Sequence, residues 1–232
     1  MAGPRFYFSL RSPYSWLAYR RLLGEYRDIA EQVEWVPFWE PDEASSAMLE
    51  QRRAKFPYSA MSRAKHLYVL QDVGRLCKRE GLALRWPIDR APVWEVPHLA
   101  YLVALRHGCG PGYIAAAYRA RWEQGRDICD RETVADIARE LGFDPGAAAG
   151  AGDDPELRLQ GAAILEQICT DGVFGVPFFV HARSRFWGLD RLDEFAAHLR
   201  ERAAPAPAMP VSVGAAVGLG VGSDDGHAGG CG

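Results

Sequence analysis

Residues 5–23 read RFYFSLRSPYSWLAYRRLL, and this stretch decides the fold. The short apolar run at 5–9 predicts a buried first strand. Ser12 is a favoured N-cap residue and Pro13 a favoured first helical residue, so a helix is predicted to begin soon after the strand. Two residues separate Ser12 from Ser15, which is the spacing of the cysteines in a redox CxxC motif.

The sequence that follows predicts a β-α-β opening and then a long helical region. Apolar residues continue the first helix at close to helical spacing, namely Trp16, Tyr19, Leu22, Leu23, Tyr26 and Ile29. Residues 33–37 predict the second strand. Helical patterns fill about 45–170, and in one of them, 62–80, the apolar stripe consists of Ala64, Leu67, Tyr68, Val73 and Leu76. The run GAAAGAG at 146–152 is interpreted as a flexible connector or a frayed loop.

Strand character returns late in the chain. Residues 178–180 and 184–187 predict a hairpin, and the last helix is predicted over 190–202, with Asp190 and Asp193 in a capping arrangement. The prediction is an α/β fold, a thioredoxin-like sheet (β-α-β … β-β-α) interrupted by a large all-helical insertion. Residues 1–44 and 171–202 form the thioredoxin-like domain, 45–170 the helical insertion domain and 203–232 a disordered Ala/Gly/Pro-rich tail.

Composition excludes several classes of protein. The net charge of −3 argues against binding nucleic acid through a broad basic face. No secretory signal and no apolar run long enough to span a bilayer are visible, so a cytoplasmic protein without membrane partners is expected. The five cysteines are scattered and form no CxxC pair, which argues against dithiol exchange. No zinc-ligand spacing includes the isolated histidines His66, His98, His107, His181 and His198, and no metal is expected.

Two positions allow both a structural and a functional interpretation. Ser12 could be a helix cap only, or its hydroxyl could hold an anion or a thiolate in the positive potential of the helix N-terminus. Pro177, in FGVPFF (174–179), could be an ordinary trans proline at a strand start. In thioredoxin-like folds, however, the proline at this place is cis and faces the first helix.

Several motifs together resemble the 2-hydroxychromene-2-carboxylate isomerase family. They are SPYSWL (12–17), KHLYVLQDVGRLCKREGL (65–82), RARWEQGRDICD (119–130), FGVPFF and FWGLDRLDEF (186–195). This family is closely related to kappa-class glutathione transferases, within the DsbA-like thioredoxin superfamily. The resemblance spans about residues 5–200.

The resemblance implies a site for glutathione or another small thiol. Ser12 would take the place of the CxxC cysteine and hydrogen-bond the sulfur of the bound tripeptide. Val176, before a cis Pro177, would pair through its main chain with the cysteinyl backbone. Asp190 would hold the γ-glutamyl amine, although it could also be only a helix cap, and Arg191 is a further candidate whose alternative is a solvated charge.

Other residues are candidates for the substrate side of this site. Lys65 matches a lysine that the resemblance would place near the thiol, with a solvated helix charge as the alternative. Tyr14 could wall the substrate pocket. The segment 37–56 is acidic where the family is apolar and glycine-rich, so Glu40 is a candidate pocket carboxylate, with a surface-loop charge as the alternative.

Some conspicuous residues are given structural roles instead. Trp16, Phe186 and Trp187 are predicted to belong to the core, and Arg126 and Asp127 to form an ion pair within a loop.

The function that the resemblance implies is a thiol-dependent isomerase acting on a conjugated carbonyl compound. Lys65 would then stabilise the oxyanion that develops on the substrate. The alternatives are a kappa-like glutathione transferase, or a thiol-independent isomerase or small-molecule binding protein on the same fold. The partners expected are a small-molecule substrate and a second copy of the chain in a homodimer.

Overall fold

The computed structural model describes residues 3–57 and 61–203. Within them a four-stranded sheet in the order β2-β1-β3-β4 forms the centre of the molecule. Its strands are β1 (Arg5–Phe8), β2 (Glu34–Pro37), β3 (Phe178–His181) and β4 (Ser184–Trp187). β1 runs parallel to β2 and antiparallel to β3, and β3 and β4 form the predicted hairpin. The chain therefore has the predicted β-α-β and β-β-α halves.

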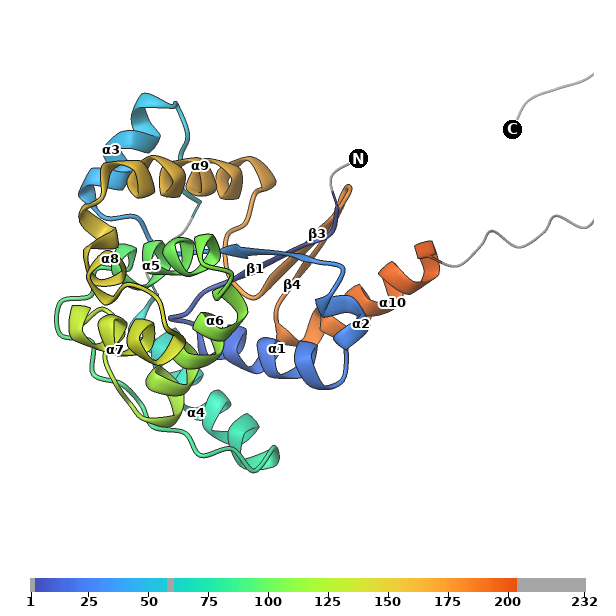
Figure 1. Cartoon of the computed structure of the whole chain (residues 1–232). Coiled ribbons are helices and arrows are strands. Elements are labelled where there is room, and N and C mark those ends of the chain that lie inside the picture. Colours follow the sequence, from blue (N-terminus) through green and yellow to red (C-terminus); the bar gives the residue numbers. More distant parts are fainter. Residues whose placement is uncertain (1–2, 58–60, 204–232) are drawn as a thin grey trace, which may run out of the picture.

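Helices cover both faces of the sheet, and the helices α5 to α8 gather beside it (Figure 1). They are α1 (Pro13–Gly24), α2 (Arg27–Ala30), α3 (Glu43–Gln51), α4 (Arg63–Arg79), α5 (Glu95–Arg106), α6 (Gly110–Tyr118), α7 (Arg131–Leu141), α8 (Pro145–Gly150), α9 (Pro155–Asp171) and α10 (Leu192–Ala203). Figure 1 shows α9 on one side of the sheet and α1 and α10 on the other. The division of the chain into domains stays a prediction, and the predicted disordered tail lies outside the described residues from 204 onward.

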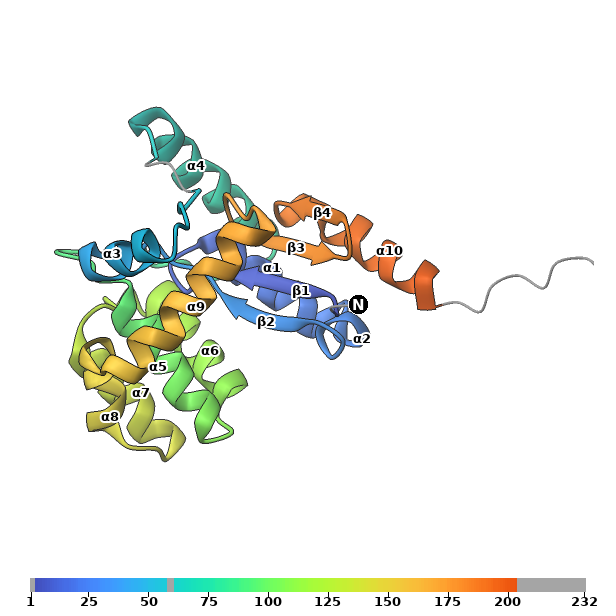
Figure 2. The ribbon, with the colours of Figure 1, turned by 90° about the horizontal axis from the view of Figure 1, so that it is seen from above.

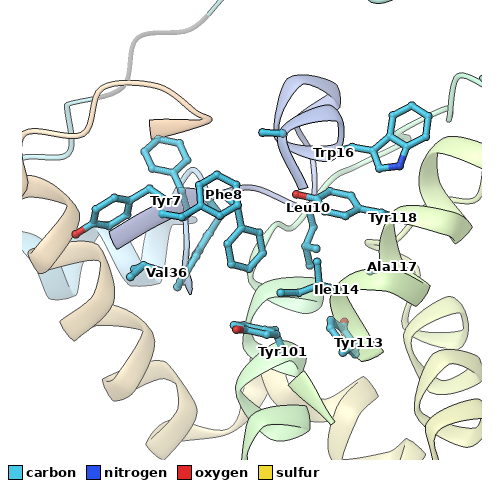
Figure 3. Packing of buried hydrophobic residues seen from close by; sticks show 14 of the residues in the cluster. Tyr7, Phe8, Leu10, Trp16, Val36, Tyr101, Tyr113, Ile114, Ala117 and Tyr118 are labelled. Atoms are coloured by element: carbon cyan, nitrogen blue, oxygen red, sulfur yellow. The ribbon is translucent and has the colours of Figure 1, made fainter. Parts of the chain in front are cut away.

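The core is aromatic because β1 supplies three consecutive large rings. Phe6 stacks on Phe179 of β3, whose other neighbour is Phe195 of α10, with ring centroids 4.9 and 4.8 Å apart. Phe8 meets Tyr101 of α5 edge to face at 5.5 Å. Figure 3 shows Phe8, Leu10 and Tyr101 in this cluster. β1 thus packs against both the thioredoxin-like part and the helical part, and Ser12 follows directly from it.

Helix α4 differs from the predicted amphipathic helix. It projects from the body of the molecule in both views (Figures 1 and 2). Val73 and Cys77 are buried, whereas Leu67 and Tyr68 are about half exposed, at 49% and 58%. The predicted stripe is therefore wrong for the first half of the helix, because only the second half reaches the core.

The GAAAGAG run is also different from its prediction. It forms α8 and a 3₁₀ turn, Ala151–Asp153, instead of a flexible connector. Asp144 caps the helix by accepting from the Gly146 and Ala147 N–H groups, at 2.8 and 3.3 Å. The turn packs on α5, where a β-carbon on Gly152 would make an ordinary van der Waals contact with Val96 at 3.7 Å.

Candidate active site

A cavity of about 1450 Å³ opens at the N-terminus of α1. Its walls come from α1, the segment after β2, helix α4, and the segments before β3 and after β4. All predicted site residues line it: Ser12, Tyr14, Glu40, Lys65, Val176, Pro177, Asp190 and Arg191. The fold therefore brings together residues from five separate stretches of sequence, while the role of each stays a prediction.

Ser12 caps α1 and still has a hydrogen-bond donor to offer. Its Oγ accepts from the Ser15 N–H at 3.2 Å, and its carbonyl accepts from the Trp16 N–H at 3.1 Å. Among the described residues, none accepts a hydrogen bond from the Ser12 hydroxyl. A hydroxyl can accept and donate at the same time. The capping and ligand-holding interpretations of Ser12 are thus compatible.

Buried polar contacts fix the loop that carries Ser12. Ser15 is fully buried, and its Oγ accepts from the Ser9 N–H at 3.2 Å. Tyr118 donates to the Ser9 carbonyl at 3.1 Å, and burial raises the pKa of its phenol well above the ordinary value. Figure 3 shows the Tyr118 ring reaching toward Leu10 at the end of β1. Ser15 therefore has a structural role below the cavity.

His98 holds the next residue of this loop. Its Nε2 accepts from the Leu10 N–H at 3.1 Å, so Nδ1 carries the proton and donates to the Trp94 carbonyl at 2.7 Å. Burial lowers the pKa of His98 to about 3; the hydrogen bond to the Trp94 carbonyl opposes this shift, and Arg121 and Arg11 add smaller decreases. His98 is thus a neutral structural residue at neutral pH.

Tyr14 links α1 to α4 across the cavity. Its hydroxyl donates to Asp72 Oδ2 at 2.8 Å, and Asp72 also accepts from Arg75 at 3.0 Å. Burial, followed by the hydrogen bond to Asp72, raises the pKa of Tyr14. Tyr14 therefore stays a neutral phenol whose proton is directed toward Asp72, and it lines the cavity. Lys65 lies two helical turns before Asp72, and its side chain is exposed.

Arg11 and Glu40 form an ion pair in the cavity wall. The Arg11 guanidinium also lies over the Trp94 ring, 5.1 Å from its centroid. Both side chains are only about one-third exposed, at 38% and 32%. Glu40 thus lines the cavity as one half of an ion pair, and its role as a pocket carboxylate stays a prediction.

The opposite wall presents main-chain groups and a carboxylate. The Val176–Pro177 peptide bond is cis, and the Pro177 carbonyl accepts from the Gly188 N–H at 3.0 Å. No described residue hydrogen-bonds the main chain of Val176, so an extended ligand could pair with it. Asp190 is 74% exposed and lies 3.7 Å from Arg191. Gly188 has φ +110°, and a β-carbon there would come within 2.6 Å of the Asp190 carboxylate, so this turn requires glycine.

The prediction that Trp187 belongs to the core is wrong. Trp187 is 49% exposed and forms part of the cavity wall with Phe174, 4.9 Å away between ring centroids, because β4 is an edge strand. Phe186 is only partly buried, against Phe195. Trp16 is buried as predicted.

Two predicted side-chain pairings are replaced by others. Arg126 pairs with Asp136 of α7 at 2.6 Å, instead of with Asp127, whose carboxylate accepts from the Cys129 N–H at 2.9 Å. Asp193 accepts from Arg21 and Tyr26 of the first helical region, at 2.6 and 2.8 Å, and α10 begins only at Leu192. The second replacement connects segments that are far apart in the sequence.

The sequence interpretation missed Arg11 and Asp72. Arg11 stands directly before Ser12, and Asp72 stands seven residues after Lys65 on the same face of the helix. Their positions relative to these predicted site residues could have indicated that they line the site.

Within the described ranges, no three His, Cys, Asp or Glu side chains lie together as metal ligands would. His181 and His198 are not isolated, because their ring nitrogens lie 3.2 Å apart.

No helix in the described part of the chain has the length and apolarity to cross a membrane.

Comparison with known families agrees with this architecture. Residues 5–200 match the DsbA-like thioredoxin domain. The chain belongs to the DsbA-like thioredoxin family. A curated relative, 2-hydroxychromene-2-carboxylate isomerase from Sphingobium xenophagum, is 27% identical over 198 residues, which cover 84% of this chain and 96% of the relative.

Solved structures show the same fold. A 2-hydroxychromene-2-carboxylate isomerase superposes with a TM-score of 0.67 at 19% identity, over 86% of this chain and 95% of that one. The cytosolic disulfide reductase DsbM from Pseudomonas aeruginosa, solved with GSH, gives a TM-score of 0.55 at 19% identity, over 86% of this chain and 98% of that one. The predicted fold class and the resemblance stated from the sequence are confirmed.

Proposed function

We propose that this DsbA-like protein is a thiol-dependent isomerase that interconverts the cis and trans forms of a conjugated carbonyl compound, with glutathione as the thiol. The observation that carries the proposal is Ser12. It occupies the first position of the CxxC spacing, lines the cavity, and has a hydroxyl proton with no acceptor among the described residues. The 27% identity to an isomerase over most of both chains supports the same reaction class.

The residues present fit a bound glutathione. The Ser12 hydroxyl and the start of α1 offer a donor and positive potential to a thiolate, which lowers the pKa of a thiol below its ordinary value of about 8.5. The unpaired main chain of Val176 suits the backbone of a short peptide, and the exposed carboxylate of Asp190 suits its amine. Arg191, which pairs with Glu194 at 2.7 Å, would orient this end of the site.

The substrate would bind between Ser12 and α4. The bound thiolate supplies a nucleophile that adds reversibly to the conjugated carbon, which makes the former double bond free to rotate before the thiolate leaves. Lys65 would stabilise the negative charge that develops on the substrate carbonyl oxygen. The ring of Tyr14 and the Arg11–Glu40 pair would bound the substrate. We further propose that the protein acts in the cytoplasm, as a homodimer.

Product analysis with the purified full-length chain tests this proposal. A cis-enone is incubated with the protein in the presence and absence of a catalytic amount of glutathione, and the products are followed by NMR and mass spectrometry. The proposal predicts a trans product of equal mass that forms only when the thiol is present. A stable thioether instead indicates the transferase, and equal rates without any thiol contradict thiol dependence.

A further inference from the structure

The charges at the inner end of the cavity limit what the substrate can carry. Apart from the Arg11–Glu40 pair, three charged groups matter there: Lys65, Asp72 and the thiolate that the proposed function requires. Asp72 is neutralised by Arg75 at 3.0 Å and also accepts from Tyr14. Arg191 also lines the cavity, but it is paired with Glu194 and Asp190. Among the described residues, Lys65 is therefore the cation left to balance the thiolate.

Glu40 neutralises the cation that adjoins Ser12 in the cavity wall. Arg11 adjoins Ser12 in sequence and lines the same cavity, so without a partner it would attract an anion to the reacting end. Instead, Glu40 binds it, and the Trp94 ring covers one face of the guanidinium at 5.1 Å. Because the pair is about two-thirds buried, breaking it for a competing carboxylate would leave Glu40 partly desolvated and unpaired.

The remaining cations lie elsewhere or are already bound. Arg121 stacks on the same Trp94 ring, but it holds Asp89 through two contacts of 2.8 Å and does not line the cavity. Arg21 is paired with Glu25 and Asp193. Arg79 lies seven residues, or about 10 Å along α4, beyond Asp72. This part of the helix, with Cys77, lies near Arg20 in the middle of α1 and away from Ser12 at its start.

We infer that the Arg11–Glu40 pair makes this site selective for an uncharged conjugated carbonyl compound, such as a ketone or aldehyde, over one that carries a carboxylate. This inference rests on the proposed isomerase function and specifies its substrate class. It separates this chain from the Sphingobium xenophagum relative, whose name specifies a carboxylate. Glu40 acts as the specificity-determining residue, and Arg11 is the cation that it masks.

A matched pair of substrates tests the inference. One is a cis-enone and the other is the same enone bearing a carboxylate next to the carbonyl, and kcat/KM is measured for both with glutathione. The wild type is expected to favour the uncharged enone at least about tenfold, which is the effect of one unavailable charge-assisted hydrogen bond. Thiol-dependent turnover with preference for the carboxylate overturns the inference but leaves the proposed function standing. No thiol-dependent turnover of either compound overturns the proposed function itself.

Variants locate the selectivity in the pair. Glu40→Gln frees Arg11 and is expected to shift the ratio of kcat/KM values toward the carboxylate by about tenfold, whereas Glu40→Asp keeps the charge and the wild-type preference. Adding Arg11→Met to Glu40→Gln should reverse this shift, because the cation that would bind the carboxylate is then absent. Glu156→Gln, which breaks the exposed Arg106–Glu156 pair far from the cavity, controls for loss of an ion pair and should leave the ratio unchanged. An unchanged ratio in folded Glu40→Gln contradicts the inference, and the wild-type ratio tests it even if that variant does not fold.

Discussion

Ser12 is predicted to have two separable roles, and two substitutions distinguish them. Ser12→Ala removes both the cap acceptor of α1 and the donor to the thiolate. Ser12→Asp keeps an acceptor of equal capping quality, but it has no donor when ionised and adds a negative charge beside the thiolate. We therefore expect Ser12→Ala to lose stability and activity, and Ser12→Asp to lose activity alone.

The magnitudes follow from the contacts. Loss of the 3.2 Å bond from the Ser15 N–H to Ser12 Oγ should cost about 1 kcal/mol of the free energy of unfolding, because an N-cap Ser→Ala change costs about that much. For a chain of this length this lowers Tm by about 2–4 °C. Loss of a charge-assisted hydrogen bond of about 1.5–3 kcal/mol raises the pKa of the bound thiol by about 1–2 units. Turnover at neutral pH should fall about 10- to 100-fold.

Calorimetry and steady-state turnover measure the two effects, and ultraviolet absorbance of the bound thiolate against pH measures the thiol pKa directly. Ser12→Thr, which keeps the hydroxyl, is the matched control and should retain most of both properties. If Ser12→Ala lowers Tm but leaves turnover and the thiol pKa unchanged, then Ser12 is only a helix cap and the thiolate-holding role is refuted.

Three further predictions concern neighbouring residues. Lys65→Met should lower kcat about tenfold or more with little change in Tm, because the side chain is exposed, and Lys65→Arg should restore part of the rate; equal kcat values in all three proteins would exclude a catalytic role. Tyr14→Phe removes the 2.8 Å bond to Asp72, so amide exchange in α4 should accelerate and KM should rise, whereas unchanged exchange would show that the contact does not hold the helix. The folded pKa of His98, about 3, lies below the ordinary value of 6.5, so His98 must be neutral to fold; its contribution is present above pH 6.5 and is lost by about 1.4 kcal/mol per pH unit as the pH falls toward 3. Thermal melts from pH 7 to 4 should be flatter for His98→Gln than for wild type or for the exposed control His66→Gln.

The sequence was sufficient for the elements whose signals are local. The cap at Ser12, the proline at 13 and the apolar periodicity gave α1, and the paired apolar runs gave the β3–β4 hairpin. These signals come from backbone hydrogen bonding and from burial of one face, and both depend on neighbours within a few residues. The common location of the site residues followed from the resemblance, since strand ends and a helix N-terminus meet at one edge of this fold.

What the sequence did not predict depends on contacts between distant segments. Arg11 and Glu40 are 29 residues apart, and Tyr14 and Asp72 are 58 apart, so no spacing rule connects them. The apolar residues of α4 predict a buried stripe, because periodicity shows which residues share one face of a helix. It does not show whether another element covers that face along its whole length. Small residues in α8 read as a flexible connector because composition does not show the helix α5 against which they pack.

The second serine of SPYS explains why the CxxC spacing can persist without dithiol chemistry. Dithiol exchange needs a second thiol that can reach the first. In this chain the second position is occupied by Ser15, which is fully buried and accepts a hydrogen bond from the Ser9 N–H. A thiol is a weaker acceptor than a hydroxyl, and a buried N–H without a good partner costs about 1–3 kcal/mol. Serine at 15 therefore stabilises the loop that presents Ser12. The outer serine faces the cavity and the inner one fixes the backbone, so the two residues of the motif serve the same site in different ways.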